Sequence, residues 1–214
     1  MDARKAKGAV MAERRGLTPL QLDALREVGN IGSGNAAVAL STMVDKKVML
    51  SVPRASLVPL VKVSDLVGGA ETPVVGIYLH ISGDASGSML LLLEESSARE
   101  LAHLVVSGAE GGELTVVEQS ALQETGSILA GSYLNALSQM TGILLKPSVP
   151  GFAMDMAGAI IDFILVEISQ SEDYVLVIET EFDVLQHKIR GHLILFPDLG
   201  SLDIILGRLG VKAD

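Results

Sequence analysis

Three polar residues near the start of the chain have types and a spacing that could do chemistry. Asp23, Glu27 and Asn30 follow one another at steps of four and three residues, which places them within about 60° of one another on a helix. Carboxylates and an amide on one strip can form hydrogen bonds and charge-assisted contacts with another molecule. A solvated helix face has the same pattern, so the strip alone leaves both interpretations open.

The segment GNIGSGN, at 29–35, has the glycine density of a loop that wraps a phosphate. A phosphate loop needs a strand before it and a helix start after it. Here the helical pattern begins near residue 19, so the glycines are expected inside a helix. Glycine in a helix interior costs up to about 1 kcal/mol relative to alanine. We therefore expect a compensating close approach by another chain segment or by a partner.

The chain contains an internal repeat with an offset of 97 residues. Residues 23–53 align with 120–150 without a gap and share 13 identities in 31 positions. Leucine and alanine replace Gly32 and Ser33 in the second copy, a change that a phosphate loop could not tolerate. The aligned pairs of the polar strip and of a later proline are Asp23 and Ser120, Glu27 and Glu124, Asn30 and Ser127, and Pro53 and Pro150.

Both copies open with the chemistry of a helix start. Thr18 precedes Gln21 by three residues and Thr115 precedes Glu118 by three, so each pair can form a capping box. Helices are predicted from near 19 and 116, with later helical patterns at 95–107 and 199–209. Segment 154–169 fits a helix or a buried strand, and we favour a helix for its first part. Strands are predicted at 46–52, 73–81, 86–93, 143–149, 173–181 and 188–196.

These elements predict an α+β fold. The strands are joined too closely for parallel crossovers throughout, so we expect a roughly six-stranded, mostly antiparallel sheet covered by helices, with pseudo-twofold symmetry. One domain should span 18–214, with repeats at about 18–112 and 115–214, after a flexible basic tail at 1–17 in which Met11 is an alternative start. The apolar residues of the first helix that should face the sheet are Leu22, Leu25, Val28, Ile31, Ala36, Leu40 and Met43.

Composition excludes several classes of function. A formal net charge of −10 argues against binding to a nucleic-acid backbone. The chain has no cysteine, which excludes disulfides and thiolate metal sites and fits a reducing compartment. We predict a cytoplasmic protein without membrane insertion, because no apolar run approaches the length of a span. The four histidines have no ligand spacing, so no intrinsic metal or cofactor is expected.

The motif resembles that of a known family. Asp/Ser-x3-Glu-x2-Asn-x22-Pro is the signature of the chemotaxis phosphatases of the CheC, CheX and FliY type, and this chain has it in full as Asp23, Glu27, Asn30 and Pro53. The second copy departs from it at Ser127. Two motif-bearing halves resemble CheC more than CheX, which has one motif helix, or FliY, which carries a switch-binding domain.

The resemblance implies an enzyme that hydrolyses the aspartyl phosphate of a CheY-like receiver. In such proteins the glutamate engages a receiver lysine, and the asparagine orients the attacking water; Glu27 and Asn30 occupy these positions. The Mg²⁺ ion is expected on the receiver substrate. A serine hydroxyl cannot present the paired groups of an amide, so the second site, Glu124 and Ser127, is expected to be weak or vestigial.

The resemblance also implies a second partner, the receptor deamidase CheD. An aspartate in the segment that matches 150–159 takes part in that complex, and here it is Asp155. An ordinary aspartate at a helix start remains an equal interpretation of this residue. A second overall function also stays open, namely a binding module for CheD or for a receiver, with catalysis secondary or absent.

Overall fold

The computed structural model describes residues 17–106, 113–167, 174–184, 187–198 and 200–211. The predicted tail falls outside these ranges except at Leu17. The α-helices are α2 (Pro19–Val44), α3 (Glu95–Val105), α4 (Val116–Thr141), α5 (Ala157–Glu167) and α6 (Ser201–Arg208), and two 3-10 helices are η1 (Leu60–Lys62) and η2 (Ser64–Val67). The strands are β1 (Val48–Pro59), β2 (Pro73–Gly83), β3 (Gly87–Glu94), β4 (Leu145–Pro147), β5 (Gly151–Met156), β6 (Tyr174–Val184) and β7 (His187–Pro197).

The strands form one antiparallel sheet in the order β1-β6-β7-β3-β2-β4, with β5 also paired to β2. The predicted α+β class and antiparallel sheet are confirmed. The sheet has seven strands rather than six, because the counterpart of β1 in the second half is divided into β4 and β5. The expectation of a helix at the start of 154–169 is wrong for 154–156, which pair with β2 as the end of β5.

The sheet has pseudo-twofold symmetry about its two central strands, β3 and β7. Strands β2 and β3 of the first half correspond to β6 and β7 of the second, and the strand order reads the same from either edge after this exchange. Each half also places its first strand beside the other half: β1 pairs with β6, while β4 and β5 pair with β2. The two halves therefore share one sheet.

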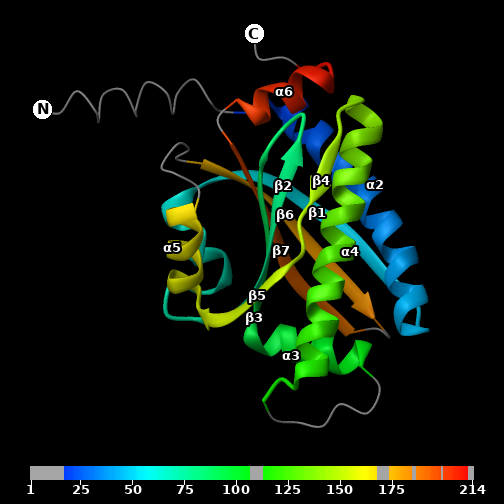
Figure 1. The fold of residues 1–214 in the computed structure, drawn as a ribbon, viewed down its shortest axis with the longest axis vertical. Coiled ribbons are helices and arrows are strands. Elements are labelled where there is room, and N and C mark those ends of the chain that lie inside the picture. The colour runs from blue at the N-terminus through cyan, green and yellow to red at the C-terminus, as the bar shows by residue number, and fades with distance from the viewer. Residues whose placement is uncertain (1–16, 107–112, 168–173, 185–186, 199, 212–214) are drawn as a thin grey trace, which may run out of the picture.

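Helices cover both faces of the sheet. On one face α2 and α4 lie side by side, and α5 lies on the other (Figure 1). Along β3, Met89, Leu91 and Leu93 belong to the core beneath α2 and α4, whereas Leu90 and Leu92 pack with α5 and η2. Coverage on both faces explains why this strand is a continuous apolar run.

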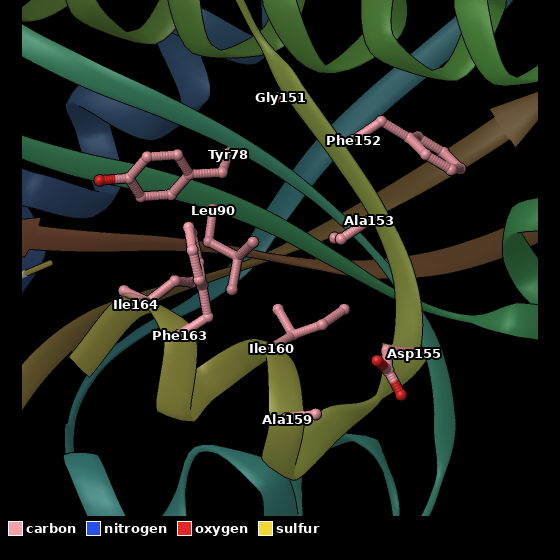
Figure 2. A pocket seen from close by; sticks show the side chains of 11 residues that line it. Tyr78, Leu90, Gly151, Phe152, Ala153, Asp155, Ala159, Ile160, Phe163 and Ile164 are labelled. Atoms are coloured by element: carbon pink, nitrogen blue, oxygen red, sulfur yellow. The ribbon is translucent and has the colours of Figure 1, made fainter. Parts of the chain in front are cut away.

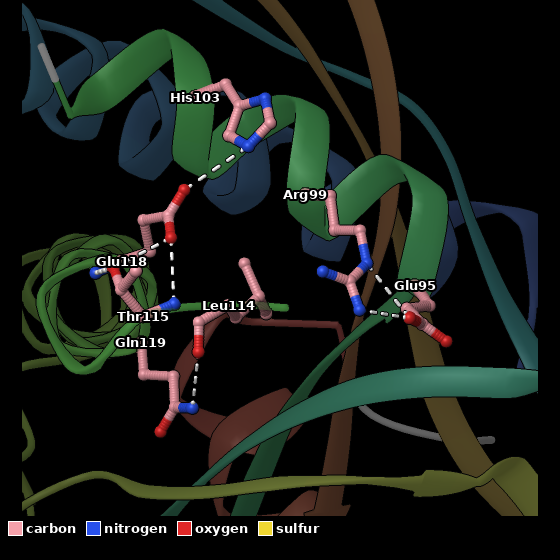
Figure 3. Close-up of polar contacts among 7 residues, drawn as sticks. All are labelled: Glu95, Arg99, His103, Leu114, Thr115, Glu118 and Gln119. Carbon is pink, nitrogen blue, oxygen red and sulfur yellow. Dashed lines mark hydrogen bonds and ion pairs between the residues drawn. The ribbon is translucent and has the colours of Figure 1, made fainter. Parts of the chain in front are cut away.

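Each long helix begins at its predicted capping box. In α2 the Thr18 hydroxyl accepts a hydrogen bond from the Gln21 backbone N–H at 3.3 Å, and the Gln21 side chain accepts one from the Thr18 N–H at 2.8 Å. In α4 the Thr115 hydroxyl accepts a hydrogen bond from the Glu118 backbone N–H, and the Glu118 carboxylate accepts one from the Thr115 N–H. The other carboxylate oxygen of Glu118 lies 3.3 Å from Nε2 of His103 on α3 (Figure 3). These contacts anchor both motif-bearing helices at their N-termini.

Candidate functional site

The strip of Asp23, Glu27 and Asn30 lies on the exposed face of α2. Asp23 forms an ion pair with Arg26 at 3.2 Å. Within the described part of the chain, no hydrogen bond or ion pair engages the side chain of Glu27 or of Asn30. An amide and a carboxylate about one turn apart are therefore available to another molecule.

The opposite face of α2 explains why the strip points outward. Two residues expected to face the sheet are instead exposed, Ile31 by 37% and Met43 by 39%, and Leu22 is half-buried. Gly29 and Gly32 complete the buried face in place of Ile31, because residues without a side chain let neighbouring elements come closer. The predicted contacts that are buried are Leu25, Val28, Ala36 and Leu40.

The motif proline lies on the strand that supports Gly29. A Cβ at Gly29 would lie 3.3 Å from both methyl groups of Val52, the residue before Pro53. The pairing of β1 with β6 changes register between Ser51 and Arg54. Proline has no N–H to donate to a sheet and is tolerated at such irregularities. Pro53 thus lies in an irregular part of β1, directly after the residue that packs against Gly29 of α2.

The corresponding strip on α4 is more closely tied to its own fold. Ser120 is exposed and donates to the carbonyl of Val116 at 2.8 Å, Glu124 is exposed, and Ser127 is half-buried. The carbonyl of Pro150 accepts a hydrogen bond from the Gln123 side chain at 3.1 Å. The second strip therefore offers a carboxylate and a partly covered hydroxyl where α2 offers a carboxylate and an exposed amide.

The two strips form separate sites. Helices α2 and α4 run antiparallel (Figure 1), and Gly32 lies against the backbone of Tyr133. Because Gly32 lies opposite Tyr133, the antiparallel register places Ser127 opposite Val38. Val38 is eight residues from Asn30, which is about 12 Å along the helix at 1.5 Å per residue. Asn30 and Ser127 therefore cannot act on one phosphate together.

Asp155 lies on β5, on the opposite side of the sheet from the strips. It pairs with Val74 of β2, and its carboxylate accepts a hydrogen bond from the backbone N–H of Met156 at 2.7 Å. The residue is exposed and precedes α5 by two positions. It is therefore a strand residue rather than the helix-start aspartate that the sequence also allowed.

A groove of about 480 Å³ runs between β5 and α5 and includes Asp155 in its wall (Figure 2). Tyr78 lines it from β2 and Phe163 from α5, whereas Phe152 of β5 borders it but turns its side chain toward the core beneath α2 and α4. Sequence reasoning singled out Asp155 but missed these aromatic residues. On α5, Phe163 lines the groove and is 61% exposed, and Val166 lies one turn further on and is also exposed.

The described residues hold no group of three or more histidine or acidic side chains placed to bind a metal ion. His187 and His192 both lie on β7. Among the helices in the described ranges, none combines the length and apolarity needed to cross a bilayer.

Comparison with protein families matches the chain to the model described as the CheC-like family, over residues 20–57 and 117–154. These two segments contain both helical strips and both motif prolines. The match thus falls on the two copies of the repeat.

Known proteins match over longer ranges. The chain is 37% identical over 203 residues to the CheY-P phosphatase CheC of Bacillus subtilis, covering 92% of this chain and 97% of that protein. It is 34% identical over 137 residues to the flagellar motor switch phosphatase FliY of the same organism, covering 63% of this chain and 35% of FliY. Thermotoga maritima FliY has the same fold, with a TM-score of 0.73 and 20% identity over 92% of this chain and 99% of that structure.

Proposed function

The chain belongs to the CheC-like family, and from that premise we propose that it dephosphorylates the aspartyl phosphate of a CheY-like receiver with Glu27 and Asn30. Both curated relatives are named as phosphatases, one of them for CheY-P, and the chain is accordingly a phosphatase. The observation that supports these two residues is their exposure without a partner in the described fold. A site prepared for a substrate protein has this property.

Asn30 orients the water that attacks the phosphorus. Hydrolysis of an acyl phosphate proceeds in line, and its rate depends on positioning and charge stabilisation. The Asn30 amide presents a donor and an acceptor on one plane, and it adds no negative charge beside the phosphate. The receiver supplies the Mg²⁺ ion and a lysine, so the missing contribution is a positioned water.

Glu27 sets the docking register. Its carboxylate lies about one helical turn before Asn30 and would form a charge-assisted contact with the receiver lysine. Such a contact fixes the distance between Asn30 and the phosphate. We also propose that the protein acts in the cytoplasm, with which the absence of cysteine is consistent.

The second strip contributes less. Ser127 is half-buried and offers one hydroxyl, so a water at Glu124 and Ser127 would lack one of its two orienting contacts. Loss of one oriented group in other enzymes slows the reaction by about 10²–10³-fold. We therefore assign turnover to Asn30.

Release of phosphate from a phosphorylated CheY-like receiver tests this assignment. Asn30→Ala should lower the rate by about 10²–10³-fold, whereas Ser127→Ala should remain close to wild type. Asn30 is exposed, so its replacement leaves the core intact. Activity retained by Asn30→Ala, or lost by Ser127→Ala, would overturn the assignment.

The groove at Asp155 favours a second function, as a binding module for a CheD-like deamidase. It combines one exposed carboxylate with a cavity of about 480 Å³ and the exposed aromatic ring of Phe163, a composition typical of protein docking sites. It lies across the sheet from Asn30, so both functions can coexist. Phosphate release measured with and without the deamidase separates the two: a chain that binds the deamidase but releases no phosphate would be a binding module alone.

A further inference from the structure

Gly34 lies one turn after Asn30 on the exposed face of α2, and its lack of a side chain is not explained by packing. A Cβ at Gly34 would meet no heavy atom within 4 Å, whereas one at Gly29 or Gly32 would press on a neighbouring element. Glycine in a helix interior is destabilising relative to alanine. The fold therefore bears this cost without an internal contact in return.

Two exposed apolar residues lie on either side of Gly34. Ile31 precedes it by three residues and is 37% exposed, and Val38 follows it by four and is 70% exposed. Residues at these spacings share one face of a helix. Together they form an apolar surface with a gap at its centre, next to the amide of Asn30.

The repeat allows this apolar surface to be compared with its counterpart on α4. In α4 the positions that correspond to Ile31, Gly34 and Val38 hold Ile128, Gly131 and Asn135. Ile128 is half-buried, and Asn135 is polar. The surface beside the asparagine strip is thus more exposed and more apolar than its counterpart on α4, although both helices have the isoleucine and the glycine.

The position of the surface identifies what covers it. Gly34 is four residues beyond Asn30, or about 6 Å along the helix. A specific interface covers about 800 Å² on each partner, which is many times the surface of one residue. A domain that brings its phosphate to Asn30 must therefore also cover Gly34.

We propose that Ile31, Gly34 and Val38 form the apolar part of the receiver-docking surface, with an apolar side chain of the receiver seated on the backbone of Gly34. This inference rests on the proposed function, since it takes the receiver as the partner that reaches Asn30. Glu27 and Asn30 then provide polar recognition, and the Gly34 gap provides shape recognition. The glycine determines how closely the receiver can approach.

Binding of a CheY-like receiver loaded with beryllofluoride, a stable analogue of the acyl phosphate, tests the surface. The receiver is one on which the wild-type protein shows Asn30-dependent phosphatase activity. Gly34→Ala fills the gap with one methyl group and should raise Kd about tenfold, as overpacking of a close contact does, without lowering Tm. Val38→Asn, which copies the residue at 135, should also raise Kd.

Gly131→Ala is the matched control, because a Cβ there also meets nothing within 4 Å. It should keep the wild-type Kd. Unchanged Kd in Gly34→Ala and Val38→Asn, beside normal Asn30-dependent activity of the wild type, overturns the surface and leaves the proposed function standing. If the wild-type protein shows no Asn30-dependent activity on any CheY-like receiver, both the proposed function and the docking surface are overturned. A change in self-association by sedimentation, with Kd unchanged, assigns the face to a second copy of this chain and also overturns the proposal.

Discussion

Gly32 of α2 packs directly on the backbone of Tyr133 of α4: a Cβ at Gly32 would lie 2.8 Å from the Cα of Tyr133 and 3.2 Å from its nitrogen. The two motif-bearing helices therefore touch at a point that only glycine allows. Asn30 lies two residues before this contact. The crossing thus helps to set the direction in which Asn30 points.

Gly32→Ala should lower the free energy of unfolding by about 1–3 kcal/mol, because the added methyl group must push two backbones apart. Urea unfolding measures the change. Gly34→Ala is the control on the same helix, where a Cβ meets nothing, and it should raise stability by up to about 1 kcal/mol. Equal effects of the two substitutions would contradict the close contact.

Ser127→Asn should give the α4 strip the amide that it lacks. In an Asn30→Ala background, this change should restore part of the phosphate release from a phosphorylated receiver, because Glu124 is already exposed in the equivalent position. Ser127→Gln supplies the same amide one carbon further out and serves as the control for geometry. If Ser127→Asn gains nothing, the half-buried environment of residue 127 rather than its side chain inactivates the second site.

Asp155→Lys should abolish binding to a CheD-like deamidase and leave Tm unchanged. Asp155 is exposed, and its hydrogen bond is to the N–H of its own neighbour, so the fold does not depend on the carboxylate. Asp162→Lys is the control, since Asp162 is exposed on α5 but does not line the groove. Calorimetric titration of both variants decides the matter, and equal affinities would remove Asp155 from the interface.

Glu118 should make stability depend on pH in acid. The hydrogen bonds from the backbone and hydroxyl of Thr115, helped by the charge of His103, hold the pKa of Glu118 below its ordinary value of 4.5. A carboxyl whose pKa is lowered by folding stabilises the protein above that ordinary value, and the contribution is lost as pH falls through the lowered pKa. Tm of the wild type should therefore fall on acidification below about pH 4.5.

Glu118→Gln should reduce this acid dependence while keeping the capping box. Gln21 already fills the equivalent position in α2 with the same pair of hydrogen bonds, so glutamine fits the geometry. Thermal melts of both proteins between neutral and acidic pH provide the comparison. Glu113→Gln, which changes an exposed glutamate nearby, should follow the wild type; an identical acid profile for Glu118→Gln would show that the carboxyl contributes nothing.

Local signals in the sequence were sufficient for most elements of this fold. The capping boxes at Thr18 and Thr115 mark the starts of α2 and α4, because a cap is made within four residues of the chain. Segment 154–169 could not be divided correctly, since its apolar residues suit both a strand and a helix. Pairing of 154–156 with β2 decided that question, and no local pattern reports such pairing.

The candidate site was predictable to a similar extent. Helical periodicity alone places Asp23, Glu27 and Asn30 on one strip, and all three are exposed. Periodicity also predicted that Ile31 would face the sheet, but Ile31 is exposed. The error arises because the approach of α4 to Gly32 rotates the buried face away from Ile31, and that approach depends on residues about a hundred positions away.

By itself the sequence determined the repeat, the starts of the long helices and the spacing of the polar strip, because each depends on neighbours along the chain. Only the tertiary structure decided that each half places its first strand beside the other half, that the two strips are separate sites, and that a groove joins Tyr78 to Phe163. These are contacts between distant residues. They are selected by the burial of apolar surface on both faces of one sheet, which is a property of the whole chain.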